Sequence, residues 1–177
     1  KLKPDQLDLL KRTIPSHTEA ARPADLFETA IPRIWTLNAA GRNLVGLFNW
    51  DAADYSFGYP LAKLGLDPAR TYIAFDFWSN GLTEPFSGKL ARTLPPQSCE
   101  VLSVCEITAA PQVISTSRHI TQGVMDLKQV KWNSKTRVLS GESVVVANDP
   151  YELRILIQTV NGAFKPLEVK ADLPAVQ

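Results

Sequence analysis

The sequence predicts an all-β protein: an antiparallel β-sandwich preceded by one short N-terminal helix. Two segments, 71–78 and 44–50, carry apolar or aromatic residues on both of their alternating faces, which is typical of strands packed on both sides. Further strand-like segments follow at intervals of about 8–12 residues, the spacing of a sandwich or barrel. Strands covered on both faces in a small all-β chain imply stacked sheets, or a sheet docked on a larger body.

The first element in the chain is a helix. Pro4 suits a first helical turn, and Leu7, Leu10 and Ile14 recur at i, i+3 and i+7, so that they share one helical face. Pro15 ends the helix. A short amphipathic helix needs a surface to cover, and the neighbouring sequence does not offer one.

The strands are expected from residue 33 onward, after a polar linker and a short apolar segment. Residues 1–32 are therefore assigned to the helix and a connector, and residues 33–177 to the sandwich. Asn161-Gly162 lies between two apolar runs and is a strong hairpin signal. The expected strands lie near 33–38, 44–50, 55–62, 71–78, 86–94, 99–107, 112–115, 128–133, 136–147, 152–159 and 163–170.

The charge and hydropathy patterns exclude two classes of partner. The 19 basic and 18 acidic side chains nearly cancel, and no basic stripe or polybasic run is present. The chain therefore lacks the positive charge that attracts proteins to the phosphates of nucleic acids. No uninterrupted apolar stretch approaches the ~20 residues needed to cross a bilayer. We expect neither a nucleic-acid nor a membrane partner.

The spacing of the two cysteines argues against a disulfide. Cys99 and Cys105 lie in one expected strand, roughly 20 Å apart at the standard rise, so they are predicted to be free thiols, buried as small apolar residues.

The chain begins at Lys1, and its only methionine is Met125. We therefore expect a piece processed or excised from a longer protein.

A search for catalytic and cofactor motifs finds little. The two histidines and two cysteines match no metal-ligand spacing, and no glycine-rich phosphate loop or other cofactor motif is present. His119 lies beside Ser115 and Ser117, but no G-x-S-x-G turn accompanies it. We expect Arg118 and His119 to bond neighbouring carbonyls or to line an interface.

The aromatic strand 71–78 contains one unusual carboxylate. Asp76 shares its face with Tyr72 and Trp78, and we expect it to pair with an arginine or a tyrosine hydroxyl because an unpaired buried charge is costly. Trp50 and Trp78 occur in the most apolar strands and are expected in the core. Trp132 is the tryptophan expected at the surface, where it is a candidate for sugar stacking.

Several segments, read in order, resemble the C-terminal part of α-galactosidase-like (melibiase-type) glycoside hydrolases. The resemblance covers about residues 4–157. The matching stretches are Arg22–Glu28, Val45–Trp50, Gly65–Asp67, Tyr72–Trp78, Leu94–Leu102, Ser115–Gly123 and Asp149–Leu153.

This resemblance implies a (β/α)₈ catalytic barrel followed by an antiparallel β-sandwich. Residues 1–14 then look like a remnant of the last barrel helix, and residues 22–32 like the connector. The family's nucleophile and acid/base are aspartates on barrel strands upstream of Lys1, so no residue of this chain inherits a catalytic role.

The leading hypothesis is a noncatalytic accessory domain of a retaining glycoside hydrolase that packs against the barrel. An exposed barrel-facing patch would also let the isolated chain self-associate. The residues expected to pack between the domains are Leu7, Leu10, Ile14, Tyr72, Asp76, Trp78, Arg118 and His119. Two alternatives remain: a carbohydrate-binding module that holds polysaccharide near the barrel, and a free-standing enzyme that uses His119.

Overall fold

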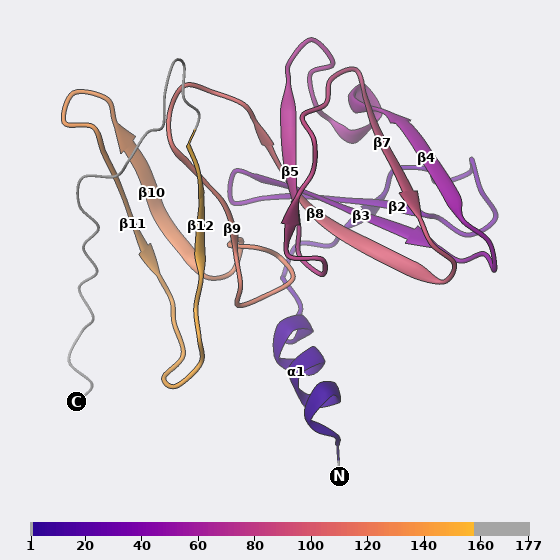
Figure 1. Ribbon diagram of the computed structural model, residues 1–177, viewed down its shortest axis with the longest axis horizontal. Helices are drawn as coiled ribbons and strands as arrows, with labels where there is room; N and C mark the ends of the chain where they lie inside the picture. Colours follow the sequence, from indigo (N-terminus) through magenta and orange to yellow (C-terminus); the bar gives the residue numbers. More distant parts are fainter. Residues whose placement is uncertain (1, 158–177) are drawn as a thin grey trace.

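A six-stranded antiparallel sheet lies at the centre of the computed structural model, which describes residues 2–157 (Figure 1). Its strand order is β1-β2-β3-β8-β5-β6. In that order the strands are β1 (Arg22–Pro23), β2 (Ile34–Ala39), β3 (Arg42–Asn49), β8 (Ser98–Glu106), β5 (Tyr72–Asp76) and β6 (Gly81–Leu82).

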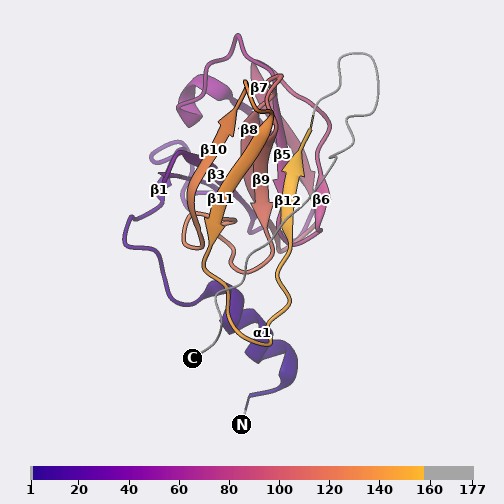
Figure 2. The same cartoon turned by 90° about the vertical axis from the view of Figure 1, so that its left-hand side faces the viewer.

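Smaller antiparallel pairs lie on both sides of this sheet, so the predicted all-β sandwich is confirmed (Figures 1 and 2). On one side β4 pairs with β7, and the 3₁₀ helix η1 follows β4. On the other side β9 pairs with β12, and β10 pairs with β11. These elements span β4 (Tyr55–Pro60), η1 (Leu61–Leu64), β7 (Lys89–Leu94), β9 (Gln112–Thr116), β10 (Leu127–Asn133), β11 (Val138–Ser143) and β12 (Leu153–Leu156).

Strand β5 is buried along its whole length, as the alternation in 71–78 predicts. Tyr72 and Ala74 belong to the main core between the central sheet and the β4–β7 layer. Ile73 and Phe75 point to the opposite face, where they pack with Ile114 of β9. The two faces of one strand thus serve two separate cores, which accounts for its apolar character on both sides.

The turn between β2 and β3 has a local cause. Ala40 and Gly41 both have positive φ, 50° and 72°, and they connect the paired residues Ala39 and Arg42. A two-residue hairpin turn of this type needs φ > 0 at both positions, which glycine adopts without strain.

Most predicted elements are present, with different bounds. The helix α1 spans Pro4–Thr13. The strand expected over 55–62 ends at Pro60, where the chain enters η1 and then Gly65, at φ 77°. The strand expected over 136–147 is shortened to β11. The strand expected over 163–170 and the hairpin signal at 161–162 lie outside the described residues.

The connector expected over 22–32 enters the sandwich itself. Arg22 and Pro23 form β1, which pairs with Trp35 and Thr36 of β2. Helix α1, in contrast, extends away from the sheets (Figure 1), and none of its residues is buried. None of the described helices is long and apolar enough to cross a membrane.

Candidate functional site

Helix α1 is attached to the sandwich at its C-terminal end. The carbonyl of Arg12 accepts a hydrogen bond from the Ile120 main-chain N–H at 2.9 Å. The Arg12 guanidinium donates to the Ser117 carbonyl at 2.8 Å and also pairs with Asp8 at 2.8 Å. The last turn of α1 is therefore fixed to the 117–120 loop, while its first turns extend into solvent.

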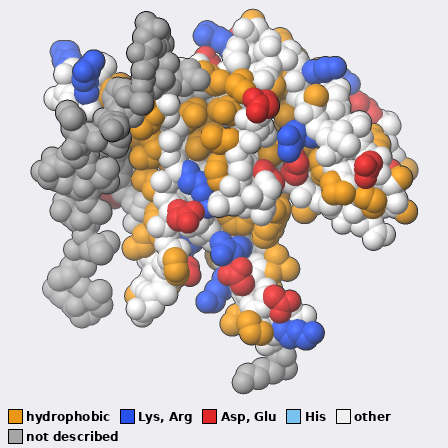
Figure 3. Space-filling view, viewed as in Figure 1, with side chains coloured by type: hydrophobic (Ala, Val, Ile, Leu, Met, Phe, Trp, Pro, Cys, Tyr) orange, Lys and Arg blue, Asp and Glu red, His pale blue; other side chains and the backbone are white. Residues whose placement is uncertain are grey.

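The apolar stripe on α1 is left uncovered by the described residues. The exposed fractions of Leu7, Leu10 and Ile14 are 48%, 36% and 58%. Apolar side chains are visible along the projecting helix in the space-filling view (Figure 3). We call Leu7, Leu10 and Ile14 the α1 stripe.

Arg118 and His119 lie where α1 meets the sandwich. His119 is buried, its Nδ1 accepts a hydrogen bond from the Thr121 main-chain N–H at 3.2 Å, and it lies 2.9 Å from the Thr121 hydroxyl. Burial lowers the pKa of His119, although the nearby carbonyls of Thr13 and Pro15 oppose this shift. Arg118 donates to the Val144 carbonyl, as expected, whereas the hydrogen bonds of the His119 side chain within residues 2–157 go to Thr121 and not to a carbonyl.

Tyr72 and Asp76 do not lie at an outer surface, contrary to the expectation that they contact a neighbouring domain. Both are buried inside the sandwich. The Tyr72 hydroxyl accepts a hydrogen bond from the main-chain N–H of Asp67 at 3.1 Å. The β4–β7 layer and η1 cover this face of β5, so neither side chain is available to an external partner.

The predicted partner of Asp76 was also wrong. Its carboxylate accepts hydrogen bonds from three main-chain N–H groups, those of Ser79 at 3.0 Å, Val101 at 3.2 Å and Trp78 at 3.4 Å. No arginine or tyrosine hydroxyl bonds to it within the described residues. Asp76 therefore ties the β5–β6 turn to β8.

Two tryptophans predicted in the core are exposed. Trp50 and Trp78 have exposed fractions of 47% and 38%. Each lies just beyond the end of its strand, since β3 ends at Asn49 and β5 at Asp76. Trp78 lines a hollow of about 430 Å³ next to α1, together with Asp8 and Arg12.

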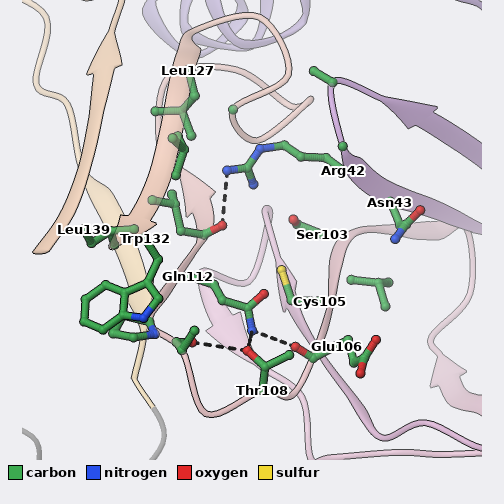
Figure 4. Close-up of a pocket in the computed structure, with 18 of the residues that line it drawn as sticks. Arg42, Asn43, Ser103, Cys105, Glu106, Thr108, Gln112, Leu127, Trp132 and Leu139 are labelled. Carbon is green, nitrogen blue, oxygen red and sulfur yellow. Dashed lines mark hydrogen bonds between the residues drawn. The ribbon is translucent and has the colours of Figure 1, made fainter. Parts of the chain in front are cut away.

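A larger cavity of about 700 Å³ lies between the central sheet and the β10–β11 hairpin (Figure 4). Strands β3 and β8 form one wall, and the hairpin forms the other. The side chains from the central sheet include Arg42, Ser103 and Cys105. Trp132 and Leu139 come from the hairpin, and the close-up places them across the cavity from Arg42.

Arg42 supplies a positive charge to this cavity. Its guanidinium donates to the carbonyls of Val113 at 3.1 Å and Ile114 at 3.4 Å. Burial lowers the pKa of Arg42, and the charge of Asp126 acts in the opposite direction. Gly123 approaches the guanidinium so closely that a Cβ there would lie 2.9 Å from it, so a larger residue at this position would displace the Arg42 side chain.

The cavity has aromatic and amide groups as well. Trp132, predicted at the surface, is half-buried in the wall. The Gln112 amide donates to the Glu106 carbonyl at 2.7 Å and to the Thr108 hydroxyl at 3.0 Å. The Glu106 carboxylate pairs with Arg70 at 3.3 Å. A charged group, an aromatic ring and amides around one hollow are the usual components of a small-molecule site.

The cysteines are free, as predicted. Cys105 lines the cavity and is half-buried, and burial raises the pKa of its thiol. Cys99 is exposed, contrary to the prediction that it is buried, because it lies near the beginning of β8.

The arrangement around His119 does not assemble a nucleophile and base. The Ser115 hydroxyl donates to the Gln122 side chain at 2.8 Å, and the Ser117 hydroxyl accepts from the Glu152 main-chain N–H at 2.8 Å. Neither serine bonds to His119 within residues 2–157. In the same part of the chain, no group of three His, Cys, Asp or Glu side chains is placed to hold a metal ion.

Sequence reasoning missed Arg42, the charged residue of the cavity. It follows the turn residue Gly41 and has the ordinary appearance of a surface arginine. The available signal was the strand alternation: Arg42 is two residues before Leu44, so both point to the same face. Leu44 is buried on that face with Ala39 and Val124.

Comparison with known proteins gives partial structural similarity only. No family model matches the chain, and no curated protein matches it. The arabinose complex of a variant GH27 β-L-arabinopyranosidase from Geobacillus stearothermophilus is 21% identical over 50% of this chain and 20% of its own, with a TM-score of 0.42. The wild-type enzyme gives 22% identity over 48% of this chain and 19% of its own, with a TM-score of 0.40.

A third structure comes from Bacteroides fragilis NCTC 9343 and is provisionally named an α-galactosidase/melibiase. It is 14% identical over 48% of this chain and 17% of its own, with a TM-score of 0.36. The chain thus spans a fifth or less of these glycoside hydrolase structures. At this level of similarity no activity, substrate or partner transfers from them to this chain.

Proposed function

We propose that this chain is a noncatalytic accessory β-sandwich of an α-galactosidase-like glycoside hydrolase, and that it packs against the catalytic barrel of the same polypeptide and stabilises it. The observation that carries the proposal is the α1 stripe. It is an apolar helical face, attached to the sandwich at one end and uncovered by any described residue.

A helix in this situation needs a packing partner. Isolated helices shorter than ~12–15 residues are marginal in water, and α1 has 10 residues. Most helical stability in proteins comes from burying an apolar face, and α1 buries none. A surface that covers the α1 stripe would supply the missing stabilisation.

The connector adds a second exposed apolar group. Phe27 is 94% exposed and has φ of 70°, a conformation that is strained for a non-glycine residue. The loop around it is nevertheless held firmly, because the buried Asp25 carboxylate accepts from the main-chain N–H groups of Arg33 at 2.9 Å and Ile34 at 3.2 Å. A rigid loop that presents an exposed aromatic ring suits an interface with little ordering cost.

The barrel is the partner favoured by the sequence. The stretches Arg22–Glu28 and Val45–Trp50, with the others in their order, resemble the C-terminal part of melibiase-type glycoside hydrolases. In that arrangement α1 belongs to the barrel's last helix, and the interface between domains would bury roughly 600–1,500 Å². His119 and Arg118 would then support the joint between the two domains from the sandwich side.

Hydrogen exchange tests the packing role directly. In the 177-residue chain, the α1 amides should exchange rapidly, because nothing described covers them, while the β5 amides should exchange slowly. In a polypeptide that also carries the barrel encoded upstream of Lys1, the α1 amides should become protected. Equal exchange of α1 in both proteins would contradict the proposal, as would an upstream sequence that encodes no barrel.

A paired substitution sharpens this test. Leu10→Lys should change the stability of the 177-residue chain by less than about 0.5 kcal/mol, as expected for a surface position, but should lower the Tm of the barrel-containing protein. It should also reduce self-association of the isolated chain in sedimentation velocity. Asp5→Lys, in the polar part of α1, is the matched control and should affect neither property.

The noncatalytic part of the proposal has its own test. The purified chain should show no turnover of aryl α-galactosides beyond that of a buffer blank. Turnover that disappears in His119→Ala would instead establish the free-standing enzyme.

Carbohydrate binding is a second candidate function, favoured by one observation. The half-buried Trp132 lines the cavity of about 700 Å³, where an aromatic ring and amide side chains face the same space. Heat of binding with a panel of glycans, measured by calorimetry, would support this function, and the absence of heat with every glycan would remove it.

A further inference from the structure

We infer that the cavity between β8 and the β10–β11 hairpin binds a saccharide bearing a carboxylate, namely a uronic acid residue, with the carboxylate on Arg42 and the sugar ring against Trp132. The inference rests on the second candidate function, carbohydrate binding, and specifies its ligand. It is independent of whether α1 packs on a barrel.

The dimensions of the cavity fit one or two sugar rings. Its volume is about 700 Å³, within the ~300–1,000 Å³ of typical small-molecule sites. It is bounded by strands on two sides, β8 of the central sheet and β10 of the hairpin. Strand walls position side chains more rigidly than loops do.

The positive charge of Arg42 is the feature that favours a ligand with a carboxylate. No carboxylate oxygen of residues 2–157 lies within 4.0 Å of its guanidinium, since every ion pair among them involves other basic groups. Asp126 interacts with Arg42 electrostatically, without direct contact. The Asp126 carboxylate instead accepts a hydrogen bond from the Tyr151 hydroxyl at 2.8 Å. A desolvated cation that bonds to carbonyls but has no carboxylate partner within residues 2–157 is unfavourable, and a bound carboxylate would relieve that cost.

The guanidinium retains the donors for this contact. The two hydrogen bonds to β9 carbonyls use two N–H groups, and a guanidinium has five. Arginine and carboxylate groups commonly pair through two parallel hydrogen bonds. Lys128 also lines the cavity and adds positive charge, whereas the Glu106 carboxylate is paired with Arg70.

The opposite side of the cavity suits the body of a sugar. The indole of Trp132 provides a flat apolar surface. The amide N–H groups of Gln112 donate to the Glu106 carbonyl and the Thr108 hydroxyl, so its side-chain oxygen is the group that can accept from a sugar hydroxyl. A neutral sugar would satisfy these groups and leave Arg42 without a carboxylate partner. An acidic sugar would satisfy both sides, so we expect acidic sugars to bind more tightly.

Calorimetry with the full chain and two probes, D-galacturonate and D-galactose, tests the inference. We expect galacturonate to bind at least 10-fold more tightly than galactose, with an affinity that falls as salt is added. Trp132→Ala should weaken both sugars. Arg42→Lys should reduce the preference for galacturonate, because lysine keeps the charge and loses the paired donors.

A second measurement leaves Arg42 unchanged, because its bonds to β9 make any substitution there a perturbation of the fold as well. Cys105 lines the cavity and Cys99 does not, so iodoacetamide labelling followed by mass spectrometry compares a site thiol with an internal control. Galacturonate should slow the labelling of Cys105 and leave that of Cys99 unchanged.

The outcomes separate the inference from the function on which it rests. Equal binding of galactose and galacturonate, dependent on Trp132, would overturn the acid preference and leave carbohydrate binding standing. Protection of Cys105 by acetate as strong as that by galacturonate would show a simple anion site and overturn the role of the sugar. No binding and no protection would overturn both.

Discussion

Replacing Asp76 by alanine should destabilise the isolated chain substantially. Asp76 is buried, with 3% of its surface exposed, and its carboxylate accepts hydrogen bonds from the main-chain N–H groups of Ser79, Val101 and Trp78. Alanine removes the acceptor and leaves these part-buried donors without their partner. The effect should be independent of any other domain, because every partner of Asp76 belongs to the sandwich.

The magnitude follows from the geometry. A hydrogen bond to a charged group contributes about 1.5–3 kcal/mol. The Trp78 contact is long, at 3.4 Å, so we count only the Ser79 and Val101 bonds and expect a loss of about 3–6 kcal/mol. This is a large part of the ~5–15 kcal/mol that typically stabilises a domain. Asp76→Asn keeps one acceptor oxygen and should lose about half as much.

Urea unfolding, followed by tryptophan fluorescence, provides the measurement. With a slope of about 2 kcal/mol per molar urea, the midpoint for Asp76→Ala should fall by roughly 2 M. Asp54→Ala is the matched control, because Asp54 is exposed in the loop before β4, and its midpoint should stay within experimental error. A loss below about 1 kcal/mol for Asp76→Ala would refute the assigned role of this carboxylate in joining the β5–β6 turn to β8.

Two further predictions concern the core and the joint with α1. Leu102 is fully buried in the main core, so Leu102→Ala should cost about 2–5 kcal/mol and lower the calorimetric Tm by several degrees; an unchanged Tm would contradict this placement. His119 has a pKa lowered by burial, so the unfolded chain binds more protons than the native chain as the pH falls through about 6.5. The stability of the wild-type chain should therefore decline below that pH more steeply than that of His119→Gln, as measured by urea unfolding at pH 5.5 and 7.5; equal slopes would contradict it.

The tryptophans show where strand patterns stop being informative. Trp50 and Trp78 continue the apolar runs of their strands in the sequence, and the core prediction followed from that continuity. In the structure the backbone leaves the sheet one or two residues earlier, at Asn49 and Asp76. Alternation constrains a side chain only while the strand is paired, so both indoles turn toward solvent.

The covering layers were also beyond sequence reasoning. The polar-tipped face of 71–78 was expected to need a missing neighbour, but the β4–β7 pair and η1 already cover Tyr72. The cavity side chains come from segments as distant as Arg42 and Trp132. Their meeting depends on how β3 and the β10–β11 hairpin are placed, which no local pattern encodes.

The sequence by itself determined the helix between Pro4 and Pro15, the turn at Ala40-Gly41, the two-sided character of β5 and the positions of most strands along the chain. These features have local causes: fixed or permissive backbone angles and a side-chain period of two. Only the tertiary structure decided that Asp76 is an internal tie, that the α1 stripe stays uncovered and that Arg42 lies beside a cavity. Burial and charge pairing depend on residues far apart in the chain, so they appear only when the layers are assembled.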